Sequence, residues 1–354
     1  MTTTAEDRDK IKIGISIGDV NGIGLEVIIK TLSNHDIINE FIPVVYASSK
    51  VISYYKKALN LNEFNWNGIN TADEANPKRI NVVNVWNDEV TINAGIANET
   101  GGNYAFKSLE AATKDLASGK IDVLVTAPIN KQNIQSKNFN FAGHTEYLAN
   151  MSNTDSALMT LISGDLRIAT LTGHVPLKDV AKSITREGIQ KALNTLNQSL
   201  KRDFNIVKPK IAVLGLNPHA GDNGLLGDEE IQTIKPAIDK ANKDGIFVMG
   251  PYGADGFFAS GNYKQFDAVL GMYHDQVLTP FKTLAFETGV NFTAGLPIVR
   301  TSPDHGTGYD IAGQNKANES SFRAACFMAK DIFFNRKFYK EMTANPLQKQ
   351  RVED

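Results

Sequence analysis

Three of the six histidines in this sequence lie where an imidazole could bind a metal ion. His174, His219 and His274 each come shortly after an apolar run that predicts a β-strand. In open α/β sheets, ligands gather beyond the carboxyl ends of the strands. Three imidazoles delivered there can hold one divalent metal and leave positions open for water or substrate. Such a donor set favours Zn²⁺, while Mg²⁺, Mn²⁺ and Co²⁺ stay open. The alternative is three separate strand-end histidines that make structural hydrogen bonds.

A fourth histidine belongs to a loop that opens into a predicted helix, within Phe141–Tyr147. Thr145 can cap that helix, and an anion bound beside His144 can rest on the free amides of its first turn. The alternative is an ordinary helix start with a histidine that faces solvent. His35 has no such neighbours, and we expect it on the surface.

Cations and an amide follow later in the chain, at Lys282, Asn291 and Arg300. At the edge of an α/β cleft these groups suit the binding of a carboxylate or phosphate. Each cation taken alone is more often a solvated surface charge than a ligand-binding group.

Two glycine-bearing loops could approach a cofactor. The first, Gly18–Gly24, lacks the order G-x-G-x-x-G, and Asp19 places a carboxylate where a pyrophosphate would need amides. We interpret it as a strand-to-helix turn at the rim of the cleft. The second, Ser302–Gly313, combines several glycines with His305, and it is either a ligand-binding loop or a tight structural one.

Apolar runs alternate with helical patterns along the chain, which predicts α/β layers around a largely parallel sheet. The predicted strands are Ile11–Ile17, Ile42–Ala47, Ile80–Val85, Ile121–Thr126, Arg167–Thr172, Lys210–Leu216 and Phe266–Gly271. The predicted helices are Leu25–Leu32, Val51–Leu59, Tyr104–Ser118, Thr145–Met151, Thr185–Leu200, Glu229–Ala241 and Ser320–Phe334. The Asn-rich segment Leu61–Pro77 is weakly periodic and is expected to be a surface excursion.

The composition bounds the class of protein. With 354 residues, 42% of them hydrophobic and 21% charged, the chain can form two lobes or one large α/β unit. A net charge of -2 argues against a broad nucleic-acid or membrane surface. The one cysteine, Cys326, is expected to be a packed thiol in a reducing compartment. The polar start Met1–Asp9 has no apolar leader, so we expect a cytoplasmic protein.

Taken together, the motifs resemble the signature segments of the 4-hydroxythreonine-4-phosphate dehydrogenase family, in matching order from Ile11 to about Asn318. The segments that carry the resemblance are Gly143–Glu146, Gly173–Leu177, Gly215–Gly221, Tyr273–Gln276 and Asp304–Thr307. The loop from His305 to Asn318 and the segment Ile17–Gly24 also look like the cofactor loop and the glycine-rich start of isocitrate and isopropylmalate dehydrogenases. One departure is Gly253–Phe258, where the family usually reads proline-alanine-aspartate-threonine; Asp255 is kept.

The resemblance implies a two-lobed α/β/α subunit of the isocitrate/isopropylmalate dehydrogenase-like type, with a cleft between the lobes. Residues 1–130 with 300–354 would form the cofactor-side lobe, and residues 131–299 the lobe for substrate, metal and dimerisation. It also implies a homodimer with active sites at the subunit interface and a non-Rossmann site for NAD or NADP.

The resemblance further implies roles for individual residues. His174, His219 and His274 would hold one divalent metal. The cofactor would lie on His305, Gly306, Asp310 and Asn318. The substrate contacts would be His144, Thr145, Lys282, Asn291 and Arg300. Either Lys282 or Asp275 would accept the hydroxyl proton.

The implied reaction is oxidation of 4-phosphohydroxy-L-threonine to 3-amino-2-oxo-4-phosphooxybutanoate, a step towards pyridoxal 5′-phosphate. The oxidised product decarboxylates to 3-amino-1-hydroxyacetone 1-phosphate. Alternatives are a dehydrogenase of erythronate or threonate 4-phosphate, a more distant dihydrodiol-carboxylate dehydrogenase, a phosphometabolite-binding protein without catalysis, and a structural zinc protein.

Overall fold

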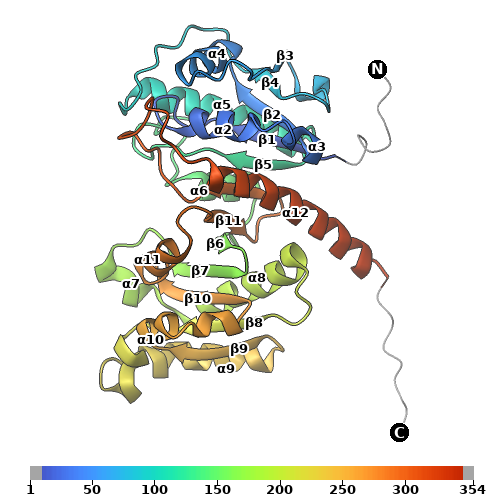
Figure 1. The fold of residues 1–354 in the computed structure, drawn as a ribbon. Helices are drawn as coiled ribbons and strands as arrows, with labels where there is room; N and C mark the ends of the chain where they lie inside the picture. Colours follow the sequence, from blue (N-terminus) through green and yellow to red (C-terminus); the bar gives the residue numbers. More distant parts are fainter. Residues whose placement is uncertain (1–9, 346–354) are drawn as a thin grey trace.

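A computed structural model describes residues 10–345, so the polar segment Met1–Asp9 lies outside the described residues. Helices and strands alternate along the chain and form layers around one continuous sheet (Figure 1). Within residues 10–345, no helix combines the length and the apolar character that crossing a bilayer requires. The mixed α/β fold predicted from the sequence is confirmed.

The sheet has twelve strands in the order β3-β4-β2-β1-β5-β12-β11-β6-β7-β10-β8-β9. The strands are β1 (Lys12–Ser16), β2 (Ile42–Ala47), β3 (Asn67–Ile69), β4 (Asn81–Asn84), β5 (Val123–Thr126), β6 (Leu158–Ser163), β7 (Leu166–Thr172), β8 (Lys210–Leu214), β9 (Phe247–Tyr252), β10 (Ala268–Tyr273), β11 (Val290–Ala294) and β12 (Arg300–Pro303). The segment Leu61–Pro77 lies largely at the surface, as expected of a surface excursion, and it also contains the short edge strand β3.

The main helices are α2 (Gly24–Leu32), α3 (Ile37–Glu40), α4 (Ser49–Ala58), α5 (Glu99–Ala117), α6 (His144–Met151), α7 (Leu177–Ser183), α8 (Arg186–Phe204), α9 (Lys235–Lys243), α10 (Ala254–Ala259), α11 (His274–Ala285) and α12 (Ser320–Thr343). Short turns of other helical types lie at η1 (Ala72–Glu74), η2 (Pro218–Gly224), η3 (Glu230–Ile234) and η4 (Asn262–Gln265). The predicted α/β alternation is therefore present, with several helix ends shifted by a few residues.

The sheet is parallel within each half, but the two halves run in opposite directions. β1, β2, β3, β4, β5 and β12 are parallel, and so are β7, β8, β9 and β10. In the middle, β11 is antiparallel to β12 and β6, and β6 is antiparallel to β7. The strand order supports the proposal of two lobes that meet near β12 and β11, because residues before 130 and after 300 supply all the strands on one side.

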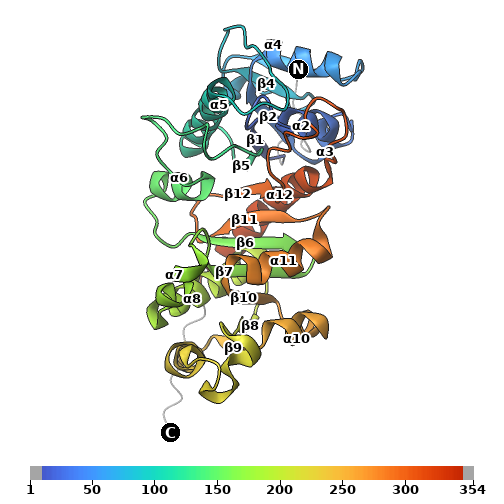
Figure 2. The same ribbon diagram turned by 90° about the vertical axis from the view of Figure 1, so that its left-hand side faces the viewer.

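The two faces of the sheet are covered differently. On one face, a single apolar core joins α2, α4, α8, α9 and α12, and Cys326 of α12 is buried in it as expected. On the other face there are two separate cores, one under α5 and α6 and the other under α10 and α11. Figure 2 looks onto this second face, with α6 above the level of β11 and α11 below it. The gap between these two cores lies over β12, β11 and β6.

Candidate active site

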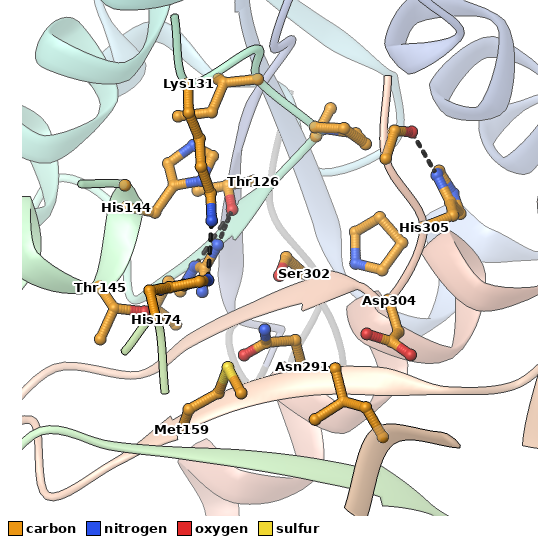
Figure 3. A pocket seen from close by; sticks show the side chains of 18 of the residues that line it. Thr126, Lys131, His144, Thr145, Met159, His174, Asn291, Ser302, Asp304 and His305 are labelled. Atoms are coloured by element: carbon orange, nitrogen blue, oxygen red, sulfur yellow. Dashed lines mark hydrogen bonds between the residues drawn. The ribbon is translucent and has the colours of Figure 1, made fainter. Parts of the chain in front are cut away.

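A cavity of about 290 Å³ lies over this gap (Figure 3). Its floor is formed by side chains of the central strands: Thr126, Met159, Asn291, Arg300 and Ser302. Strand register places these five residues on one face of the sheet. Its walls come from the loops after β5, β7 and β12 and from the first turns of α6 and α11. The polar residues therefore meet over the face of the antiparallel centre of the sheet.

Arg300 is a buried cation on the floor of this cavity, with 3% of its surface exposed. Its guanidinium donates to the Thr126 hydroxyl from Nε (3.1 Å) and Nη2 (2.7 Å), and no described carboxylate forms an ion pair with it. Burial lowers the pKa of Arg300 to about 10, although the charge of the Glu146 carboxylate opposes that fall. Because a buried charge is stable only when it is compensated, this guanidinium is prepared for an anionic ligand.

His144 and Thr145 begin α6 beside Arg300. The residue that caps α6 is Gly143, without a side-chain hydrogen bond, so Thr145 lies inside the first turn and is not the cap. The His144 Nε2 atom is enclosed and has no partner among the described residues, so this histidine does not face solvent. Burial, reinforced by Arg300 and Lys131, lowers the pKa of His144 well below its usual range, so the ring is neutral.

His174 and His274 come together at the cavity wall, with ring centroids 5.9 Å apart. His274 Nδ1 is hydrogen-bonded to the Asp275 carboxylate at 2.7 Å, which leaves its Nε2 as the free ligand atom. A histidine that donates its other ring nitrogen to a carboxylate is the usual arrangement around metal ligands. His174 Nε2 lies 2.8 Å from the ammonium of Lys131, so this ring nitrogen has a cation as its partner. Burial, followed by Lys131, lowers the pKa of His174, which keeps its ring neutral as metal binding requires. These two residues fit a metal site.

His219, the third predicted ligand, lies elsewhere in the chain. It is exposed and lines a second cavity together with Tyr252, Asp255 and Asn262. Its backbone has a φ of 53°, a conformation that costs energy for a non-glycine residue and is often kept at functional sites. Within residues 10–345, no three His, Cys, Asp or Glu side chains of one chain are grouped to hold a metal ion.

Lys282 and Asp304 form a pair across the cavity, with Nζ 3.9 Å from Oδ2. Burial raises the pKa of Asp304 to about 6, although Lys282 and His274 oppose that rise. Nearby, the Oδ1 atom of Asn291 is buried and has no partner among the described residues. Asp275, the other predicted base, has 82% of its side chain exposed and binds His274. Lys282 is therefore the better placed of the two.

The glycine-bearing loop after β12 is held against the β1–α2 turn. Tyr309 donates to the Asp19 carboxylate (2.7 Å), Ile23 N donates to Thr307 O (2.9 Å) and Ala317 N donates to Glu26 (2.8 Å). Asp19 is buried and also accepts hydrogen bonds from Asn21 and Asn133. The segment Gly18–Gly24 is thus a strand-to-helix turn, as predicted.

The four predicted cofactor residues lie in different surroundings within this loop. His305 and Gly306 line the cavity, and burial lowers the pKa of His305. The His305 Nε2 atom is buried without a partner among the described residues. Asp310 and Asn318 are exposed outside the cavity, and the Asn318 side chain accepts from Ser320 N at 2.8 Å.

Thr126, Lys131 and Asp304 are among the polar residues of the cavity that were not predicted as site residues from the sequence. Thr126 ends the predicted strand Ile121–Thr126, and Lys131 lies in the loop that directly follows it. The strand-end argument that identified the histidines would also have found this loop. Asp304 is the first residue of the Asp304–Thr307 motif, and only its burial beside Lys282 distinguishes it.

Residues 39–329 match the family model described as pyridoxal phosphate biosynthetic protein PdxA. The chain is 50% identical to 4-hydroxythreonine-4-phosphate dehydrogenase from Bacteroides thetaiotaomicron, over 98% of this chain and 95% of that protein. This chain belongs to the PdxA family. The resemblance found in the sequence is thereby confirmed.

Solved structures agree with membership of the PdxA family. A crystal structure of 4-hydroxythreonine-4-phosphate dehydrogenase from Klebsiella pneumoniae aligns with a TM-score of 0.78 and 33% identity, over 92% of this chain and 98% of that one. The terephthalate 1,2-cis-dihydrodiol dehydrogenase of Burkholderia xenovorans, at 24% identity and a TM-score of 0.60, covers 91% of this chain and 98% of its own and shares the fold.

Proposed function

We propose that this PdxA-family chain is a dehydrogenase that oxidises 4-phosphohydroxy-L-threonine with NAD or NADP in the synthesis of pyridoxal 5′-phosphate. The product is 3-amino-2-oxo-4-phosphooxybutanoate, which loses CO₂ to give 3-amino-1-hydroxyacetone 1-phosphate. The observation that carries the proposal is one cavity in which a buried Arg300 without an ion pair lies beside His174, His274 and the His305 loop.

The substrate's phosphate is assigned to the Arg300 side of the cavity. Arg300, the His144 ring and the Thr145 hydroxyl line one wall and supply cationic and neutral donors. A dianionic phosphate there would compensate the buried guanidinium through charge-assisted hydrogen bonds. Lys282 and Asn291, which line the same cavity, are assigned to the rest of the substrate.

His174 and His274 are assigned as two ligands of a divalent metal, with Zn²⁺ favoured and Mg²⁺, Mn²⁺ or Co²⁺ as alternatives. His219 of a partner subunit would be the third ligand, since His219 of the same chain lies in a separate cavity. The segments that carry His174 and His219 also expose large apolar side chains, Leu177 (75%) and Leu225 (78%). Apolar groups beside an incomplete site are consistent with a homodimer that covers both.

A metal bound to these histidines would lower the pKa of the substrate hydroxyl. The chain must then accept the proton that leaves this hydroxyl. Lys282 is assigned as the acceptor at Nζ in its neutral amine form, which arises when the ammonium first passes a proton to the Asp304 carboxylate, whose Oδ2 lies 3.9 Å away. His305 and Gly306 are assigned to the nicotinamide end of the cofactor, with Asp310 and Asn318 further along the loop. The hydride acceptor would thus lie next to the carbinol carbon.

The activity is tested by following nicotinamide reduction with 4-phosphohydroxy-L-threonine, in the presence of a divalent metal and after treatment with a chelator. Erythronate and threonate 4-phosphates serve as parallel substrates. Chelator-sensitive turnover of the amino substrate supports the proposal. Turnover of a sugar-acid phosphate alone would contradict the assigned substrate, and absence of turnover on all three would contradict the assigned activity.

The shared metal site is tested by mixing two inactive variants, His174→Ala and His219→Ala, under conditions in which subunits exchange. If the ligands come from two subunits, a mixed dimer has one site with all three histidines, so mixing restores turnover. A mixture of His174→Ala with His274→Ala is the matched control and stays inactive. No recovery in the first mixture would contradict the intersubunit assignment.

A further inference from the structure

Lys131 is a residue of the cavity wall to which the proposed reaction gives no role. It lies in the loop between β5 and α6, and its ammonium is 2.8 Å from His174 Nε2 (Figure 3). A lysine ammonium can only donate hydrogen bonds, so His174 accepts through its Nε2 lone pair and carries its proton on Nδ1. This lone pair faces the cavity that His274 also lines.

The same lone pair cannot serve two cations. A metal that binds His174 through Nε2 needs the electrons that the Lys131 ammonium now uses, and a lysine ammonium and a metal ion would also repel each other at this distance. Metal binding must therefore displace the Lys131 side chain from His174. Lys131 is largely exposed, so its flexible stem can move without disturbing the core.

The displaced ammonium stays near the anion-binding wall of the cavity. The Lys131 side chain runs beside Gly143, where a Cβ atom would lie 3.7 Å from Lys131 Cε, and His144 and Thr145 follow Gly143 directly. Arg300 and His144 line this side of the cavity, and among the described residues Glu146 supplies the carboxylate that lines it with them. An ammonium at the start of α6 is thus within reach of a phosphate bound to Arg300, with Glu146 as the competing partner.

We propose that Lys131 alternates between two partners: it occupies His174 Nε2 in the metal-free chain, and after metal binding it holds the phosphate of the substrate. The inference rests on the metal and phosphate sites assigned under the proposed function. Because the metal releases Lys131 for the phosphate, metal and substrate each strengthen the binding of the other. Lys131 would be a substrate-binding residue. It would also favour an order of binding in which the metal binds before the substrate.

The test uses Lys131→Met, which keeps the length of the stem and removes the charge, with Lys131→Gln as a second variant. Lys137→Met, on the same exposed loop, is the matched control. Calorimetric titration measures Co²⁺ binding without substrate, and then binding of 4-phosphohydroxy-L-threonine to the Co²⁺-loaded protein. We expect both Lys131 variants to bind Co²⁺ about tenfold more tightly and the substrate on the order of tenfold to a hundredfold more weakly. Lys137→Met should match the unmodified chain in both titrations.

Unchanged Co²⁺ affinity in the Lys131 variants would overturn the competition for His174. Tighter Co²⁺ binding with unchanged substrate affinity would overturn the second half and assign the released ammonium to Glu146. His174→Ala separates this inference from the proposed function. If the unmodified chain binds Co²⁺ no better than His174→Ala, the metal site itself is wrong, and the competition is overturned with it.

Discussion

Arginines in two parts of this molecule have opposite surroundings. Between α8 and α12, Arg202 and Arg336 both contact the buried Asp203 carboxylate, with Nε to Oδ1 distances of 2.8 Å and 2.7 Å. On the cavity floor, Arg300 is more deeply buried than either of them, yet its partners are threonine hydroxyls. The first cluster compensates its charges within the fold. The second leaves a cation whose compensation must come from a ligand, which is how binding sites differ from structural ion pairs.

The largest stability effect is expected at the compensated cluster. Asp203→Ala leaves two guanidinium groups without their shared carboxylate, and breaking such a buried pair costs about 3 kcal/mol. Denaturant unfolding should show this loss in the free energy of unfolding, and substrate affinity should change little. A variant as stable as the unmodified chain would show that the Asp203 cluster does not hold α8 and α12 together.

The same substitution at two arginines gives the sharpest comparison. Arg336→Met removes a partner of Asp203 and should lower the free energy of unfolding by about 2 kcal/mol. Arg300→Met removes a buried cation without an ion pair, so stability should stay the same or rise by about 1 kcal/mol. Thermal and denaturant unfolding of the two variants check this. Equal destabilisation would mean that Arg300 is a structural residue.

A smaller effect on the stability of the fold is expected at acidic pH. Although burial raises it, the two arginines and their hydrogen bonds hold the pKa of Asp203 below its usual value. A depressed carboxyl pKa stabilises the fold above the unfolded pKa of about 4 and loses that contribution as pH falls through the folded value. The free energy of unfolding of the unmodified chain should therefore fall below about pH 4. Asp203→Asn should lack this part of the pH dependence. If the free energy of unfolding changes with pH in the same way for the two proteins, this role of Asp203 is contradicted.

The sequence predicted the elements of this fold better than their directions. Periodicity located β1, β2, β4, β5, β7, β8 and β10 and most helices, since these are local patterns. It did not find β6 and β11, the antiparallel strands that reverse the sheet and form the cavity floor. Strand pairing depends on contacts far apart in sequence, so the position of Asn291 over that floor could not be derived.

Within the site, a residue could be predicted from the sequence only where its type and position are unusual. Histidines are rare and follow strands, so His174 and His274 were found, and the structure brings their rings together. Spacing could not show that His219 lies in another cavity. Lys131 is one of many lysines on exposed loops, and only its distance to His174 identifies it.

The most direct test of the account is binding of 4-phosphohydroxy-L-threonine and of unphosphorylated 4-hydroxy-L-threonine, measured by calorimetry with the unmodified chain and with Arg300→Met. If the Arg300 guanidinium binds the phosphate, the unmodified chain should bind the phosphorylated compound much more tightly than the unphosphorylated one. Arg300→Met should then lose about a hundredfold in affinity for that compound alone. An Arg300→Met protein that still prefers the phosphorylated compound to the same extent would contradict the account.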